Sequence, residues 1–409
     1  MPAVTEKVEL GFDESGPGNF FILDDPVQGL LDGTGYVLGG GSFFYDVSAY
    51  VTQIGVNRGK SRALDRYQSG VVTVQFNNRN RYFDPTFVAS PFYGQIVPRR
   101  DVRITANGVL VFLGTTEDWN LDYSPDGEST ASVSAADGFA FLAQQTLTAA
   151  TNPVELSGAR VTRVLDDVGV NWPLAQRTID AGNETLQGDA VTPADNVLQY
   201  LQLIESSEPG ELFIGKDGSL VFQDRNHVFP SAAVPLLTDD ASGITYSQVR
   251  VVYGSELLFT QSEISRKGSS TIVQANDLTA QEDYGVRTLT LDGLLQNTDD
   301  ALVPLATYYV STYAQPEYRF DQVELILSQL SALDQGKILA LDLGSVVQVQ
   351  FTPNGVAPAI SKYARVISIS HTTSLVEHRV VLGLGTLNAT LFQLDDAAFG
   401  ILDTGTLAF

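Results

Sequence analysis

Apolar and polar residues alternate along many short runs of this chain, which is the pattern of β-strands that bury one face. The alternation covers residues 42–147. It returns at residues 249–255 and 286–295, with polar connections between these two runs, and continues to residue 384. Turn dipeptides such as Asn107-Gly108 separate the runs and favour tight hairpins. The pattern therefore predicts a mainly β (α+β) protein with antiparallel barrels or sandwiches in both regions.

The period of the pattern changes between these two β-rich regions. Residues 157–170 repeat apolar positions at helical spacing behind Ser157, a favourable helix cap. A second helix is predicted to begin at Thr192-Pro193, since threonine caps helices and proline fits their first turn. The apolar faces of these two helices comprise Val161, Val164, Leu165 and Val168, and Val197, Leu198, Leu201 and Ile204. A third helix is predicted over residues 299–313.

These signals divide the chain into two tube-like β-barrel or sandwich domains with a small α/β domain inserted between them. The predicted segments are an N-terminal extension (1–41), a first β-barrel domain (42–148), the α/β domain (149–235), a second β-barrel domain with one helix (236–388) and a C-terminal tail (389–409).

A long connection between two predicted strands, residues 78–100, is unusually aromatic. It is rich in Asn, Pro and Gly, as loops are, yet it carries six large apolar residues: Tyr82, Phe83, Phe87, Phe92, Tyr93 and Ile96. A loop with so much apolar surface is not merely solvated. We expect it to fold back over a barrel mouth or to be buried by a partner.

The two termini carry copies of one short sequence. Residues 21–38, FILDDPVQGLLDGTGYVL, match residues 392–407, FQLDDAAFGILDTGTL, at their Leu, Asp-Asp, Gly and Leu-Asp positions. Each copy suits a short hairpin that is too small to be stable alone and must pack on something. Each copy either packs on its own chain or docks on a neighbouring protein by adding a strand. The spacing of a calcium loop is missing.

Charge limits the kinds of partner. The net charge of −24 leaves no surplus of Lys and Arg to neutralise phosphates, which argues against tight wrapping of nucleic acid. The acidic residues either keep the protein soluble or line a channel through which DNA passes without binding. One basic cluster, formed by Arg58, Lys60, Arg62 and Arg66, is expected either to be solvated or to contact an acidic neighbouring subunit.

The sequence offers little for catalysis. It contains no cysteine and three histidines, and no phosphate-binding, hydrolase or zinc motif. His371 and His378 are expected on two strands in a structural role. Glu117-Asp118 beside Trp119 resembles a glycosidase pair, but neighbouring strand residues point to opposite faces. We therefore expect no enzyme, cofactor or metal site, and no stable membrane insertion, because no run reaches the length of a membrane span.

Several segments in order resemble minor tail proteins of long-tailed phages that infect actinobacteria, in particular the hub at the distal end of the tail tube. The resemblance covers about residues 42–388 and rests on NRYFDPT (80–86), SPFYGQIVPRR (90–100), GTTEDWNLDYSPDG (114–127), SGARVTRVLDDVGVNWP (157–173), IESSEPGELFIGKDGSLVFQDR (204–225), ATYYVSTYAQPEYRFDQVEL (306–325) and LDLGSVVQVQF (341–351). Such proteins are similar to the baseplate hub of contractile-tailed phages and to the structural N-terminal part of tail-associated lysins.

The resemblance implies a homotrimer in which each chain gives two barrels to a six-fold tail tube. The implied protein is made in the host cytoplasm, sits at the tail tip, closes the tube and opens for DNA. Its partners would be a distal tail ring or tail tube protein, the tape-measure protein and other minor tail or fibre proteins. Because the sequence stops at residue 409 without a lysin domain, peptidoglycan cleavage is not carried over. The predicted subunit contacts are Phe83, Asp84, Pro85, Phe92, Tyr93, Arg99, Arg100, Leu23, Asp24, Asp25, Leu394, Asp395 and Asp396.

Two other functions stay open at this stage. One is the hexameric distal tail ring above the hub, although the α/β insert and the two barrels favour the hub. The other, from a different class, is a tail protein that binds or hydrolyses cell-wall carbohydrate.

Overall fold

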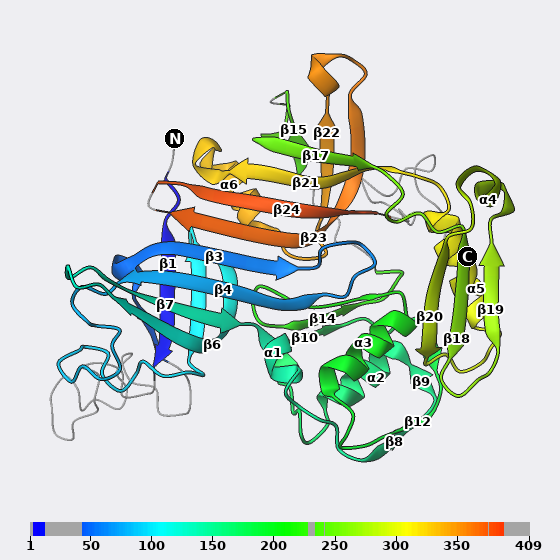
Figure 1. The fold of residues 1–409 in the computed structure, drawn as a ribbon, viewed down its shortest axis with the longest axis horizontal. Coiled ribbons are helices and arrows are strands. Elements are labelled where there is room, and N and C mark those ends of the chain that lie inside the picture. Colours follow the sequence, from blue (N-terminus) through cyan, green and yellow to red (C-terminus); the bar gives the residue numbers. More distant parts are fainter. Residues whose placement is uncertain (1–2, 13–42, 228–233, 241, 375, 388–409) are drawn as a thin grey trace.

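One sheet of 14 strands runs through both β-rich regions (Figure 1). The structure is a computed structural model that describes residues 3–12, 43–227, 234–240, 242–374 and 376–387. The mainly β fold class that the alternation predicts is confirmed. The predicted hairpin copies at the two termini lie outside the described residues.

The first β-rich region contributes half of this sheet. Its strands are β1 (Glu6–Phe12), β2 (Phe43–Asp46), β3 (Val51–Gly59), β4 (Gln68–Asn77), β5 (Asp101–Ala106), β6 (Val109–Tyr123) and β7 (Ser129–Ala136). They lie in the order β3-β4-β7-β6-β5-β1-β2, and all neighbours are antiparallel. Burial alternates along β4 and β7 as the sequence predicts, so each strand has one covered and one open face.

The second β-rich region contributes the other half. Its strands are β15 (Leu236–Thr238), β16 (Ile244–Thr245), β17 (Gln248–Tyr253), β21 (Tyr318–Ile326), β22 (Val346–Phe351), β23 (Ile360–Ser374) and β24 (His378–Thr386). They form two branches, β16-β15-β22 and β17-β21-β24, which both end on β23. Because β23 is 15 residues long, it pairs with β22 along residues 360–365 and with β3 along residues 368–374.

Gly59 lies where β3 meets β23. Its φ of 116° is in a region that favours glycine, and a Cβ atom there would lie 2.2 Å from the carbonyl oxygen of Ile367. The backbone N–H of the next residue, Lys60, donates to that same carbonyl at 2.9 Å. The close approach of the two backbones therefore joins the halves of the sheet.

The inserted α/β region folds as small sheets with three helices. Its elements are α1 (Gly138–Leu142), β8 (Ala150–Asn152), β9 (Glu155–Leu156), α2 (Ser157–Leu165), β10 (Arg177–Ile179), β11 (Thr185–Leu186), β12 (Asp189–Val191), α3 (Val197–Ser207), β13 (Glu211–Ile214) and β14 (Leu220–Gln223). Strands β10, β14 and β13 form one sheet, and β9 and β8 pair with β11 and β12.

The helix limits differ from those the sequence predicts. Helix α2 ends at Leu165, and Val168, expected on its buried face, is 83% exposed. Helix α3 begins at Val197 behind Asn196, whose side-chain oxygen accepts from the backbone N–H of Gln199 at 3.1 Å. The Thr192 hydroxyl instead hydrogen-bonds to Asp195 within a turn. Two plausible caps compete here, and only the tertiary packing of the helix selects one of them.

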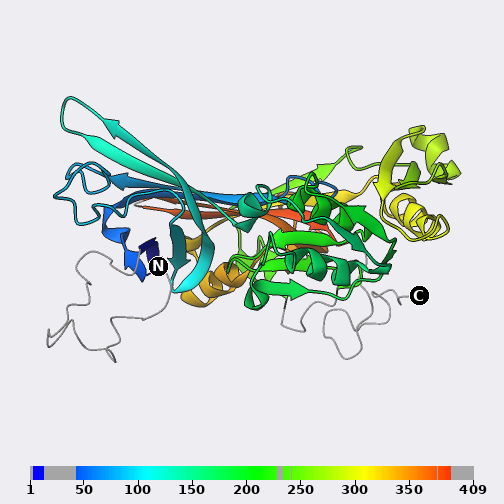
Figure 2. The same ribbon diagram turned by 90° about the horizontal axis from the view of Figure 1, so that it is seen from below.

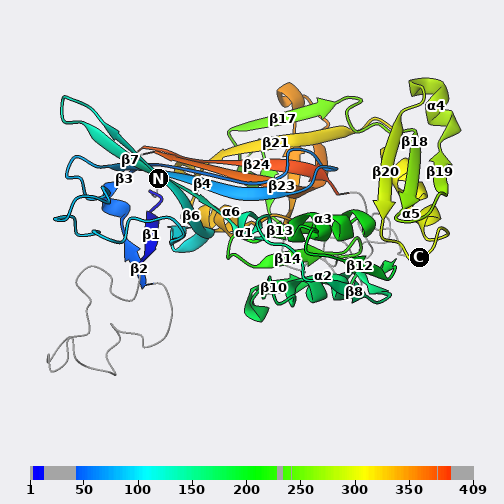
Figure 3. The same cartoon turned by 60° about the horizontal axis from the view of Figure 1, so that its bottom comes forward.

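A further unit follows β17. Its three-stranded sheet comprises β18 (Gln261–Arg266), β19 (Ile272–Asn276) and β20 (Thr288–Leu294), with α4 (Leu278–Tyr284) and α5 (Leu302–Tyr313). Residues 256–285 read as polar connections in the sequence, so β18, β19 and α4 were missed. The reason is that one face of this sheet is solvated, and α5 covers only the other. Figure 3 places the unit beyond the α/β region.

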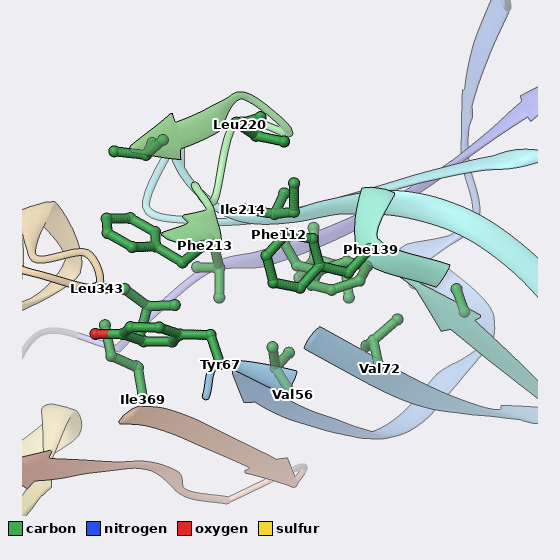
Figure 4. Packing of buried hydrophobic residues seen from close by; sticks show 14 of the residues in the cluster. Val56, Tyr67, Val72, Phe112, Phe139, Phe213, Ile214, Leu220, Leu343 and Ile369 are labelled. Atoms are coloured by element: carbon green, nitrogen blue, oxygen red, sulfur yellow. The ribbon is translucent and has the colours of Figure 1, made fainter. Parts of the chain in front are cut away.

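The large sheet is covered on one face. In Figure 2 the α/β region and α6 (Ala332–Ala340) lie on one side of it. The sequence missed α6, which begins behind Ser331. Val56 and Val72 of the sheet pack with Phe139 of α1 and with Phe213 and Ile214 of β13 (Figure 4). The main core is therefore continuous from the sheet into the α/β region.

Replacing Gly59 with alanine tests the junction. We expect Gly59→Ala to lower the free energy of unfolding by about 3 kcal/mol, because a Cβ atom there is strained by φ and collides with Ile367. Gly55 on the same strand is the matched control, since its Cβ would meet nothing within 4 Å. Gly55→Ala should change stability by less than about 1 kcal/mol in urea unfolding. Equal effects of the two variants would contradict the role of Gly59.

Candidate functional site

The aromatic loop, residues 78–100, is covered by the chain's own strands. Asn78 holds its start, because the Asn78 side-chain oxygen accepts from the backbone N–H of Phe83 at 3.0 Å. The Phe83 ring stacks on Phe76 of β4 with centroids 4.3 Å apart. The Phe92 ring lies 5.7 Å from that of Phe12 in β1. Of the two burials that the sequence left open, the structure shows the one within the chain.

Phe83 and Phe92 are both 0% exposed. Their side chains are core residues of the single chain, so they present no surface to a second subunit. This corrects their assignment as subunit contacts. The sequence showed that the loop must be buried, but it did not show what buries it.

Asp84 is also buried, and its role is local. Its carboxylate accepts from the Thr86 hydroxyl at 2.7 Å, from Arg81 at 2.6 Å and from the Tyr123 hydroxyl at 2.9 Å. These contacts, the Thr86 hydroxyl first, hold the pKa of Asp84 well below its usual range. Asp84 therefore ties the aromatic loop to β6.

The other predicted contacts in this loop lie at the surface. Pro85, Tyr93 and Arg99 are exposed, and Arg100 is half-buried. The remaining predicted contacts lie outside the described residues: Leu23, Asp24, Asp25, Leu394, Asp395 and Asp396. Subunit contact through all of these positions stays a prediction.

Two residues of the basic cluster, Arg58 and Lys60, are neither solvated nor free to contact a partner. Arg58 and Lys60 are each 6% exposed. Arg58 pairs with Asp342 at 2.8 Å and donates to the Ile214 carbonyl at 2.7 Å, while Lys60 pairs with Glu211 of β13 at 2.7 Å. These ion pairs tie β3 to the α/β region and to the loop before β22. The outer members, Arg62 and Arg66, bond to Asp65 and Ser206 nearer the surface.

Glu205 of α3 is a buried carboxyl group beside this cluster. One of its oxygens accepts from the backbone N–H of Leu212 at 2.9 Å, and the other has no hydrogen-bond partner among the described residues. Burial, together with the nearby carboxylate of Glu211, raises the pKa of Glu205 to about 8. Glu205 is therefore mostly protonated at neutral pH.

The two histidines lie on different strands, as the sequence predicts. Nδ1 of His371 in β23 lies 3.0 Å from Nε2 of His378 in β24, and Nδ1 of His378 lies 2.9 Å from a carboxylate oxygen of Glu6 in β1. Burial and the neighbouring His378 lower the pKa of His371 well below its ordinary value. The three side chains tie β1 to β23 and β24. Glu6 also lines a groove of about 210 Å³ beside β3.

The pair considered as a glycosidase site has no sugar-binding ring beside it. Glu117 and Asp118 are exposed on β6, where the strand bulges between Thr116 and Asp118. The ring of Trp119 stacks against Phe76 and Phe83 with centroids 6.0 Å away in each case. That ring is part of the aromatic core.

The open face of the large sheet carries no charge at its centre. We call the following 13 residues of β23, β3, β4 and β7 the uncharged face: Gln53, Gly55, Asn57, Val71, Thr73, Gln75, Asn77, Thr130, Ser132, Ser134, Ser370, Thr372 and Ser374. The strand register places them side by side, for example Thr372 opposite Gly55, Gly55 opposite Thr73 and Thr73 opposite Ser134. They are exposed or half-buried, whereas their strand neighbours on the other face are mostly buried.

Sequence reasoning missed this face. The signal was present, because the polar positions of the alternating runs in β4, β7 and the second half of β23 are Ser, Thr, Asn and Gln. Only the pairing of β23 with β3 brings these distant runs together.

Two classes of feature are missing from the parts of the chain that the structure describes. None of the helices there is both long and apolar enough to span a membrane. The described side chains also include no group of three or more His, Asp or Glu residues placed to hold a metal ion.

The fold of this chain is similar to that of solved phage tail proteins. The structure is similar to the tail protein from Neisseria meningitidis MC58, with a TM-score of 0.59 and 12% identity over 94% of this chain and 97% of the other. It is also similar to the 43 kDa tail protein of prophage MuSo2 from Shewanella oneidensis, with a TM-score of 0.58 and 13% identity over 93% of this chain and 98% of the other. At these identities the likeness is one of fold.

In sequence, no family model matches the chain, and no curated protein matches it.

Truncation of Phe83 tests the aromatic core. We expect Phe83→Ala to lower the free energy of unfolding by about 3–5 kcal/mol, because a fully buried ring is lost from a stacked cluster. Tyr93, which is 51% exposed in the same loop, is the control. Tyr93→Ala should stay within about 0.5 kcal/mol of the wild type. A small effect of Phe83→Ala in chemical denaturation would show that the loop is not anchored there.

Glu205 should make stability depend on pH. The pKa of Glu205 is raised to about 8 in the folded state. Its favourable contribution to the free energy of unfolding is therefore present below the ordinary pKa of 4.5, and it is lost as the pH rises towards 8. Glu205→Gln mimics the protonated group, and we expect its stability advantage over the wild type to grow by roughly 3–4 kcal/mol from pH 5 to pH 8. Urea unfolding of both proteins at pH 5 and at pH 8 measures this difference in stability. Exposed Glu282→Gln should show no such gain, and a pH-independent difference for Glu205→Gln would refute the shift.

Proposed function

We propose that this chain is a structural protein of a phage virion and forms the hub at the tip of a long, non-contractile tail. The observation that carries the proposal is the continuous sheet of both β-rich regions, in a fold similar over nearly its whole length to two phage tail proteins. In this role the chain has no catalytic task. It closes the distal end of the tail tube and opens for DNA.

The arrangement of the two halves supports the hub rather than a simple ring. Each half presents part of a large, mostly antiparallel sheet, and the two halves are held together by β23 and the buried ion pairs of Arg58 and Lys60. A homotrimer of such chains offers six similar sheet regions to a six-fold tube. The α/β region and the β18–β20 unit would then lie outside the ring and contact other tail proteins.

The partners follow from the same proposal. They are a distal tail ring or tail tube protein, the tape-measure protein and peripheral minor tail or fibre proteins. The contacts proposed for them are the exposed part of the aromatic loop, around Pro85, Tyr93 and Arg99, and the two terminal repeats. Similarity of the loop and repeats to actinobacteriophage tail proteins favours a host of that kind, with assembly in the host cytoplasm.

The copy number of the chain in purified particles tests the proposal. Quantitative mass spectrometry against a tail protein of known stoichiometry should give three copies per particle. Six copies would instead indicate the hexameric distal ring. Absence from the particles would refute a structural role in the virion.

A further inference from the structure

The uncharged face stands out in an acidic protein. The sequence has 48 acidic and 24 basic residues, yet none lies among the 13 residues of this face. Strand geometry gives the face an extent of roughly 15–20 Å in each direction. Its side chains are mostly hydroxyls and amides, which water solvates well. The face is therefore wettable but carries no fixed charge.

Charges begin at the borders of this face, on β6 and β24. On β6, Asp118 and Asp122 lie opposite Ser134 and Thr130. On β24, Arg379 lies opposite Thr372, and it is paired with Glu377 at 2.9 Å and with Glu324 at 3.3 Å. The border is thus acidic along β6, and along β24 the positive charge of Arg379 is neutralised by glutamates.

The opposite side of the same strands cannot be the open one. Ile54 and Val56 of β3 and Val72 and Val74 of β4 point into the core beneath the α/β region. Arg58 also points to that side, where Asp342 neutralises it. Arg58, the charged residue of β3, is therefore turned away from the uncharged face, and β4 and β7 carry no charged residue.

We propose that the uncharged face is the wall along which double-stranded DNA slides, an inference that rests on the proposed function. Phosphates bind Lys and Arg strongly through charge-assisted hydrogen bonds and counterion release. Hydroxyl and amide groups form weaker hydrogen bonds that water replaces at little net cost. A wall of the second kind neither holds the duplex nor repels it. This refines the expectation of an acidic channel, because the acidic residues stand at the border of the wall and not at its centre.

Adding cations to this wall tests the inference. Thr73 and Thr372 flank Gly55 in one cross-strand row and are both exposed. Particles that carry Thr73→Arg together with Thr372→Arg should release DNA about threefold or more slowly at ~50 mM salt, and approach the normal rate near ~200 mM salt. The rate is measured with a DNA-binding dye after release is triggered with isolated host envelopes.

Two controls separate charge from bulk and from position. The pair Thr73→Gln and Thr372→Gln lengthens the same side chains without charge, and Thr290→Arg adds a cation at an exposed threonine of β20. Both should release DNA at the normal rate. Double-arginine particles with the normal copy number and the normal rate would overturn the inference and leave the proposed hub intact. A double-arginine chain that folds but is excluded from particles, while the glutamine pair is included, would show that the face contacts protein.

A second measurement does not depend on the arginine variants. The chain contains no cysteine, so Thr73→Cys introduces its single thiol. In the isolated chain this thiol should react with a maleimide carrying a long polyethylene glycol chain. In assembled particles it should be protected at least tenfold, because the reagent cannot enter the channel, while Thr290→Cys shows the reactivity of a position off the wall. Full reaction of Thr73→Cys in intact particles would place the face outside and overturn the inference.

Discussion

The pairing of β23 with β3 is the contact on which the rest of the structure depends. It joins strands more than 300 residues apart in the sequence, and it requires a glycine at position 59 because the Ile367 carbonyl occupies the space of a side chain. Arg58 and Lys60 flank this glycine and pair with Asp342 and Glu211 from two other regions. Removing one partner of such a buried pair is costly, so the junction fixes the sheet halves and the α/β region together.

This junction also determines which face of the sheet is covered. The α/β region and α6 are held on the side where Arg58 and Lys60 lie, and the core of valines and phenylalanines fills the space between. The other face is left with short polar side chains.

Much of the fold was accessible from the sequence. The strands of the first region, the α/β insert, the helix near residue 305 and the burial of the aromatic loop all follow from local periodicity and turn residues. The elements that were missed, α6, β18, β19 and α4, have weaker patterns because one of their faces is solvated. The assignment of Phe83 and Phe92 to a subunit contact failed for a different reason. A run of apolar residues shows that its surface must be buried, but it does not show whether the same chain or another chain buries it.

The sequence by itself determined the class of the fold and the residue types available for function, because alternation, turns and composition are local properties. It also showed that thiol chemistry is absent. Only the tertiary structure decided that Arg58 and Lys60 of the basic cluster form internal ion pairs and that residues of four strands form one uncharged face. The physical reason is that strand pairing between distant segments depends on long-range packing, which no local pattern encodes.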